Sequence, residues 1–126
     1  MANESARVWR VFTVEDGTSR MEQVEIPLES ARFGAASKLL AGPGALFRRM
    51  DAGVALPRHT ATRRQMILTI SGENEVETDD GQKLTVRPGV VLVVEDVTGA
   101  GHLTRTLPSE DWLGVFIPLD DATTLA

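Results

Sequence analysis

The sequence contains no cysteine, and histidine occurs only twice, as His59 and His102. Without cysteine the chain cannot form a disulfide, a thiolate nucleophile or a zinc site with cysteine ligands. A P-loop, a Gly-x-Gly-x-x-Gly element and a Ser-His-Asp order are also missing. Any chemistry that uses imidazole must therefore depend on these two histidines.

The sequence also lacks a long hydrophobic run. It has no stretch of about 18 apolar residues, and its first residues, MANESARVWR, contain no apolar core of a signal peptide. We therefore expect a cytoplasmic protein without a membrane partner. The net charge of -5 and the pI of about 5.0 argue against a nucleic-acid partner, because phosphate binding needs clustered basic residues and the pair Arg63-Arg64 is too small a cluster.

The composition is that of an ordinary soluble domain. The chain has 126 residues, of which 42% are hydrophobic and 25% are charged. This length suits one domain with one core. We expect a single domain over residues 1–126, with its core in about 8–118 and a frayed C-terminal tail at 120–126.

Short runs of strand-forming residues recur along the chain, and no long helical period is present. Several short strands at close spacing favour a β-sandwich or barrel. The predicted strands are residues 7–14, 23–26, 46–50, 65–71, 74–78, 83–86, 90–95, 102–106 and 112–117.

Three segments between or within these runs have a more specific signal. Asp79-Asp80-Gly81 is a turn signal and predicts a β-hairpin between 74–78 and 83–86. The continuously apolar run 90–94 predicts a strand covered on both faces, the least exposed of the set. Residues 29–45 contain Gly42-Pro43-Gly44 and predict a loop with at most one short helical turn.

The segment that begins at Gly53 has the spacing of a metal-site motif. His59 follows Gly53 after five residues, and Gly72 follows Gln65 after six residues. This segment resembles the first motif of the cupin superfamily, which runs Gly, five residues, His, one residue, His, three or four residues, Glu, six residues, Gly. Ala61 stands where that motif has its second His, and Gln65 stands where it has Glu.

A second motif follows in the expected order. Gly81, a short spacer, Pro88-Gly89 and a later His102 resemble the second cupin motif, and His102 then takes the place of the last metal ligand. Two motifs in order are stronger support than one. The resemblance covers about residues 8–118 and is closer to a set of small, largely uncharacterised bacterial cupins, on the basis of Arg63-Arg64-Gln65, Ser71-Gly72-Glu73, Pro88-Gly89, Glu95-Asp96 and Gly99-Ala100-Gly101-His102.

The resemblance implies an all-β fold of the cupin type. This fold is a double-stranded β-helix, a conical jelly-roll barrel built of two antiparallel sheets. It also implies a small-molecule ligand in the mouth of the barrel, where ligands of such folds commonly bind.

The resemblance also implies a divalent metal, iron, manganese, nickel or zinc, on His59, Gln65 and His102. Such sites usually offer three imidazoles and one carboxylate, and here two imidazoles and a neutral amide form a weak set. Glu95 or Asp96 could supply a carboxylate only if its side chain points inward. We therefore expect either no cofactor or a weakly bound divalent metal.

Without a metal, His59 and His102 would form a pocket for acid/base chemistry, because imidazole takes and gives protons near neutral pH. Gln65 could hold a substrate oxygen. We therefore expect an acid/base enzyme of the isomerase, dehydratase or cyclase type, acting on a small carbonyl or polyketide-like compound. The alternatives are a metal-dependent oxygenase or isomerase and a non-catalytic metabolite-binding protein.

Three further residues are candidates for contacts with the substrate. Arg63 could bind a substrate carboxylate, and Phe47 and Trp112 could line the pocket. For Arg63 and its neighbour Arg64 the alternatives are solvation or an ion pair with Glu95 or Asp96.

Two structural expectations complete the prediction. Asp96 is expected to cap the turn around Gly99 through a bond from its side chain to the backbone. The apolar residues of 7–14, with Trp9 and Phe12 among them, suit an interface strand, so we expect a homodimer.

Overall fold

The computed structural model describes residues 4–126. Within these residues the chain forms eleven β-strands, and none of them forms a helix that could span a membrane. The strands are β1 (Glu4–Thr13), β2 (Ser19–Ala31), β3 (Gly34–Ala36), β4 (Leu46–Met50), β5 (Ala55–His59), β6 (Gln65–Ser71), β7 (Asn74–Glu77), β8 (Lys83–Val86), β9 (Val91–Val94), β10 (His102–Thr106) and β11 (Trp112–Pro118).

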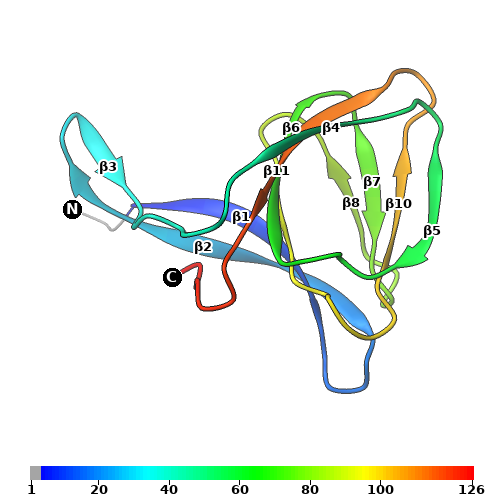
Figure 1. Cartoon of the computed structure of the whole chain (residues 1–126), viewed down its shortest axis with the longest axis horizontal. Coiled ribbons are helices and arrows are strands. Elements are labelled where there is room, and N and C mark those ends of the chain that lie inside the picture. The colour runs from blue at the N-terminus through cyan, green and yellow to red at the C-terminus, as the bar shows by residue number, and fades with distance from the viewer. Residues whose placement is uncertain (1–3) are drawn as a thin grey trace.

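The strands form two sheets that face each other across the core (Figure 1). The larger sheet has the order β3-β2-β1-β9-β6-β11-β4, and the smaller one has the order β5-β10-β7-β8. All pairings are antiparallel except that of β1 with β9, which is parallel. The predicted all-β barrel of two sheets is confirmed, with this one parallel pair as an addition.

The predicted hairpin and the predicted central strand are both present. Strands β7 and β8 pair with Asn74 opposite Val86, and the turn between them is closed by a bond from Gly81 N to Thr78 O of 3.0 Å. Strand β9 lies between β1 and β6. Alternate residues of β9 face opposite sides of the sheet, as strand geometry requires.

This alternation divides the apolar core into two clusters. The inner cluster fills the barrel and contains Leu92 and Val94 of β9, while the outer cluster contains Val93. The outer cluster is covered by β1, by β2 and by the chain around Leu119. Strand β9 therefore has apolar neighbours on both faces, which explains its continuously apolar sequence.

Outside the strongest strands the structure differs from the sequence prediction in two segments. Residues 29–45 were expected to be a loop, yet β2 continues to Ala31 and pairs with β3. Strand β5 was not predicted, because its sequence ALPRH lacks the strand pattern and is held by pairing with β10. Two contacts join the C-terminal tail to the rest of the chain: Asp120 N donates to Ala41 O at 3.0 Å, and Leu125 packs on the outer cluster.

The first two strands form a long hairpin that runs past the barrel and carries β3 at its far end (Figure 1). We call the end of this hairpin, residues 28–36, the arm. Val8 and Val11 of β1 are buried within the chain's own clusters. The residues that the sequence offered for an interface strand thus largely fill the chain's own core.

Candidate functional site

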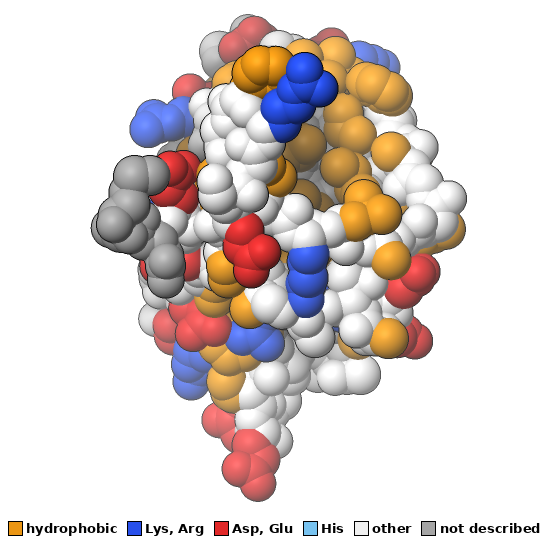
Figure 2. Space-filling model, turned by 90° about the vertical axis from the view of Figure 1, so that its left-hand side faces the viewer, with side chains coloured by type: hydrophobic (Ala, Val, Ile, Leu, Met, Phe, Trp, Pro, Cys, Tyr) orange, Lys and Arg blue, Asp and Glu red, His pale blue; other side chains and the backbone are white. Residues whose placement is uncertain are grey.

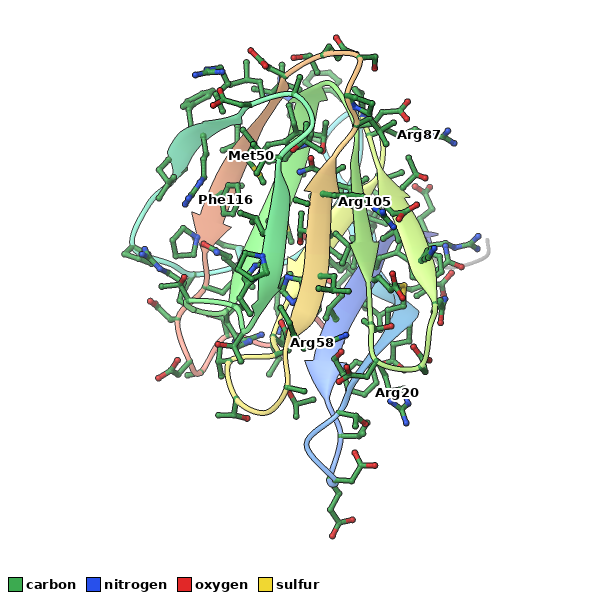
Figure 3. All side chains as sticks on the ribbon, turned by 90° about the vertical axis from the view of Figure 1, so that its right-hand side faces the viewer. Arg20, Met50, Arg58, Arg87, Arg105 and Phe116 are labelled. Atoms are coloured by element: carbon green, nitrogen blue, oxygen red, sulfur yellow. The ribbon has the colours of Figure 1, made fainter. Side chains whose placement is uncertain are left out.

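The barrel encloses a cavity of about 490 Å³ between the two sheets. Its inner part is apolar, because inward-facing residues from both sheets meet there; Met50 of β4 and Phe116 of β11, labelled in Figure 3, belong to this wall. A cavity of this size with an apolar wall and few polar groups is typical of a small-molecule site. The apolar part of its wall includes Ile67, Val76, Val86, Leu92, Val94 and Trp112.

The two histidines meet in the wall of this cavity. His59 ends β5 and His102 begins β10, and the antiparallel pairing places them opposite each other. Their ring centroids are 4.7 Å apart, with the ring planes tilted by 56°. The pairing register shifts directly after His102, as at a β-bulge, and such irregularities often re-aim a side chain at a functional site.

Gly101 allows β10 to approach β5 this closely. Its φ is 78°, and a Cβ atom at this position would lie 2.1 Å from the carbonyl oxygen of His59. Only glycine avoids both the strain of positive φ and this overlap. The distance between the two imidazoles therefore depends on the absence of a side chain at residue 101.

His102 has a buried carboxylate partner that the sequence interpretation missed. Nδ1 of His102 donates to Oδ2 of Asp96 at 2.5 Å, and Asp96 is 0% exposed. The expected role of Asp96 as a cap of the turn around Gly99 is therefore wrong. The alternation of β9 already indicates that the Asp96 side chain points inward, because Leu92 and Val94 face the barrel interior and Asp96 is the next residue in this every-second-residue series.

The hydrogen bonds of the two rings leave the same nitrogen free in each. Nδ1 of His59 lies 2.8 Å from the carbonyl oxygen of Pro57, and a carbonyl can only accept, so this nitrogen carries the proton. Nδ1 of His102 likewise carries its proton and donates a hydrogen bond to Asp96. Each neutral ring therefore keeps the lone pair of Nε2 for a ligand or a proton.

Glu95 points away from the cavity. It accepts from Arg10 Nε through Oε1 and from Arg64 Nε through Oε2, the second bond at 2.6 Å. Burial by itself raises the pKa of Glu95, but the hydrogen bonds and charges of the two arginines outweigh it and lower this pKa below its ordinary value. The expected pairing of Arg64 with Glu95 is confirmed, and Glu95 is not available as an inward carboxylate.

The two remaining motif positions also line the cavity. Gln65 begins β6 and is buried, and its amide makes no hydrogen bond to any side chain or backbone group of residues 4–126. Ala61 is buried beside the histidines, and its backbone N donates to Asp96 O at 3.1 Å. The cavity therefore has an unpaired amide at the position of the motif's Glu and a methyl group at the position of its second His.

These side chains do not fit a tightly held divalent metal. The donors available to an ion are two imidazole nitrogens and one neutral amide oxygen, and the near carboxylate, Asp96, is engaged with His102. Residues 4–126 hold no group of three or more His, Asp or Glu side chains placed to bind a metal. A structural or catalytic metal in a protein usually has at least three strong ligands.

Of the three residues expected to contact a substrate, one lies at the cavity. Trp112 is buried in the cavity wall, and its indole Nε1 donates to Thr69 Oγ1 at 2.9 Å. Phe47 is 72% exposed and points to the outer side of the sheet, as its partner Val115 does. Arg63 is exposed and also lies outside the cavity lining, whereas Arg48, which the sequence did not single out, is part of it.

Comparison with known proteins gives matches among solved structures alone. No protein-family model matches the chain, and no curated protein matches it. The DMSP lyase DddQ of Ruegeria pomeroyi is 22% identical with a TM-score of 0.48; the match covers 72% of this chain and 43% of the lyase, so the chain spans less than half of that protein. A cupin protein of Bacteroides fragilis is 17% identical with a TM-score of 0.45, and the match covers 65% of this chain and 70% of that one.

A Streptococcus pyogenes protein of unknown function is 20% identical with a TM-score of 0.43, and the match covers 68% of this chain and 72% of that protein. At such identities and TM-scores these matches carry no information about activity, substrate or metal.

Proposed function

We propose that this chain, a barrel of the cupin type, is a metal-independent acid/base enzyme that acts on a small carbonyl compound. The observation that supports it is the pair of Asp96 and His102 in the wall of an apolar cavity, with His59 opposite. A buried carboxylate that orients an imidazole and balances its positive charge is the arrangement of an effective general base.

In the proposed reaction, Nε2 of His102 removes a proton from the carbon next to a substrate carbonyl. Asp96 holds the ring by Nδ1 and compensates the charge that the ring gains. The amide of Gln65 donates to the substrate oxygen, on which negative charge develops. The electron pair of the broken C–H bond moves into the C–C bond of an enolate.

The proton then returns to the substrate, so that no external oxidant or reductant is needed. Return to a different carbon completes an isomerisation, and return to a departing hydroxyl group completes a dehydration. His59 lies close enough to His102 to deliver a proton to that other carbon or to the departing hydroxyl group, because the ring centroids are 4.7 Å apart. Attack of the enolate carbon on a second carbonyl of the same molecule gives a cyclisation.

Proton exchange in D₂O tests this proposal without knowledge of the true substrate. The protein is incubated with acetylacetone, acetoacetate and related small ketones, and deuterium incorporation is followed by NMR. We expect acceleration by the wild type and a loss of about 10²- to 10⁴-fold in His102→Gln. Asp96→Asn should still fold and should lose a similar fraction of the exchange rate, because the wrong tautomer of His102 is then favoured.

The control is Arg87→Gln, which changes an exposed residue outside the cavity lining. An exchange rate in His59→Gln/His102→Gln equal to that of the wild type would refute the proposal. Tight metabolite binding without exchange or conversion would favour the alternative of a non-catalytic binding protein.

The metal-dependent alternative has its own test. A weakly held iron, manganese, nickel or zinc ion would use Nε2 of His59 and of His102 and the oxygen of Gln65. We expect purified protein to contain less than about a tenth of an equivalent of metal and to keep its exchange activity after chelation. Activity that disappears with chelator and returns with one metal would support this alternative.

We also propose that the chain forms a homodimer through the outer face of the larger sheet. Phe47, Leu113 and Val115 of β4 and β11 alternate with the residues that face the barrel, so they point outward. Figure 2 shows hydrophobic side chains gathered around a hollow on the side of the molecule from which the arm projects. The free edge of β4 borders this face.

A second copy suits this face because the chain carries a matching projection. Phe33 in the arm is 94% exposed and Leu39, which follows the arm in sequence, is 92% exposed, which is unusual for large apolar side chains. In a two-fold dimer each arm would lie in the hollow of the other copy, so both exposed sets would be covered at once.

Light scattering coupled to size exclusion tests the dimer. We expect a dimer for the wild type and a monomer for Phe47→Asp, with Val97→Asp as the control because Val97 is 45% exposed and lies in the loop between β9 and β10, outside the proposed interface. A monomeric wild type, or a Phe47→Asp variant that remains dimeric, would refute this interface.

A further inference from the structure

Two arginines line the cavity, and they differ in their partners. Arg49 bonds Asp51 Oδ1 at 2.5 Å and Asp111 Oδ2 at 3.0 Å, so its charge is balanced within the chain. Arg48 makes no ion pair and no side-chain hydrogen bond with any of residues 4–126. An unbalanced cation is therefore part of the cavity lining.

The strand register places Arg48 on the cavity side. On β4, Met50 lies opposite Trp112 and Arg48 lies opposite Gly114, and directly opposite residues of an antiparallel pair share a face. Trp112 faces the inner core, so Arg48 shares that face. The guanidinium of Arg48 lies 5.9 Å from the ring centroid of Phe116, which is also a cavity residue.

Gly114 makes room for the indole ring of Trp112 on this side of the cavity. A Cβ atom at residue 114 would lie 2.2 Å from Cη2 of Trp112, so the indole ring already occupies the space next to the glycine. Arg48 therefore has no side chain opposite it on β11. Its stem can lie along the aromatic wall formed by Trp112 and Phe116, with the charged end still exposed to solvent.

The charge of Arg48 also differs in sign from that of the whole chain. The protein carries a net charge of -5, yet the rim of the cavity has Arg48 and Arg49 against Asp51. Other arginines without an ion pair, such as Arg63 and Arg87, are exposed outside the cavity lining. A cation beside a low-dielectric wall attracts an anionic ligand more strongly than one on an open surface.

We propose that the substrate is an anion with an apolar body, whose carboxylate or phosphate group binds Arg48 at the rim of the cavity. The guanidinium offers a planar pair of N–H donors that matches either group. The apolar body would contact Phe116 and Trp112, and the reactive end would reach His59 and His102. The identification of that reactive end rests on the proposed acid/base function.

Matched probes test the anion requirement by calorimetry. Phenylacetate and its neutral isostere phenylacetamide have the same apolar body and differ in charge. We expect the acid to bind the wild type at least about tenfold more tightly than the amide. In Arg48→Gln the two should bind within about twofold of each other, because the cation is gone while the aromatic wall remains.

Arg87→Gln is the control, since Arg87 is exposed and lies at the far edge of the smaller sheet (Figure 3). This variant should keep the full preference for the acid. Benzylphosphonate distinguishes the two sources of the charge: tighter binding than phenylacetate indicates a phosphate-bearing substrate, and weaker binding indicates a carboxylate.

Equal binding of phenylacetate and phenylacetamide to the wild type would overturn the proposal, as would binding of neither probe at about 10 mM. A preference that persists in Arg48→Gln would overturn it as well. The acid/base function fails separately: His102→Gln and Asp96→Asn should keep the preference for the acid while they lose proton exchange. Exchange unaffected in those variants, with the anion preference intact, would refute the function and leave the anion site.

Discussion

Replacement of Gly101 by alanine should both destabilise the barrel and separate the two histidines. The φ of Gly101 is 78°, and an alanine there costs about 1–2 kcal/mol of backbone strain. The new Cβ would also lie 2.1 Å from the carbonyl oxygen of His59 and 2.7 Å from the backbone N of Thr60. Both neighbours are backbone atoms, so β5 itself must move, which adds about 1–3 kcal/mol.

Gly81 provides the matched control. Its φ is 83°, close to that of Gly101, but a Cβ atom there would meet nothing within 4 Å. Gly81→Ala should therefore cost only the strain, about 1–2 kcal/mol, while Gly101→Ala should cost about 2–5 kcal/mol. The difference of about 2 kcal/mol isolates the contact between β10 and β5.

Urea denaturation followed by tryptophan fluorescence measures both changes. A difference of about 2 kcal/mol corresponds to a shift of about 1 M in the urea midpoint between the two variants. Proton exchange provides the second readout, since a displaced His59 should reduce the rate in folded Gly101→Ala but not in Gly81→Ala. Equal losses of stability, or full exchange activity in both variants, would refute the role assigned to Gly101.

Three further predictions concern the cavity and its surroundings. The pKa of Glu95 lies below its ordinary value of 4.5, so the stability that its ion pairs contribute is complete above pH 4.5 and is lost as the pH falls through the lowered pKa. Glu95→Gln should therefore lower the free energy of unfolding by about 1–3 kcal/mol in urea denaturation at neutral pH, and by progressively less below pH 4.5. Ala61→His/Gln65→Glu should restore a strong ligand set, and cobalt or zinc at about a thousandfold excess over its Kd should stabilise this variant by about 4 kcal/mol in thermal denaturation but not the wild type. Thr69→Val should cost about 1–3 kcal/mol in urea denaturation, because the buried indole N–H of Trp112 would lose its acceptor, and an unchanged midpoint would contradict this.

The strands of the barrel could be predicted because their signals are local. The continuously apolar β9, with Val93 facing one cluster and Leu92 the other, needs no knowledge of its neighbours to be assigned to the middle of a sheet. The turn at Gly81 has the same local character. Strand β5 has no such signal, since Pro57 and Arg58 contradict a strand pattern, and its structure depends on pairing with β10.

The position of each charged side chain was harder to predict, because it depends on contacts between distant segments. Asp96 has a glycine-rich sequence after it, which locally favours a turn cap, but its carboxylate instead meets His102. Arg63 and Arg48 each belong to an Arg-Arg pair and are locally alike. Only the pairing of β4 with β11, through Gly114, directs Arg48 to the cavity.

The contact between Asp96 and His102 explains how the site could act in acid/base chemistry without strong metal ligands. A carboxylate that fixes Nδ1 of a histidine orients Nε2 toward a metal in many proteins, and the same bond prepares Nε2 to accept a proton. Oδ1 of Asp96 is buried without a hydrogen-bond partner among residues 4–126, which costs stability in the resting state. With Ala61 and Gln65 in the ligand positions, the bonded pair of Asp96 and His102 is the part of the motif's ligand machinery that the cavity retains.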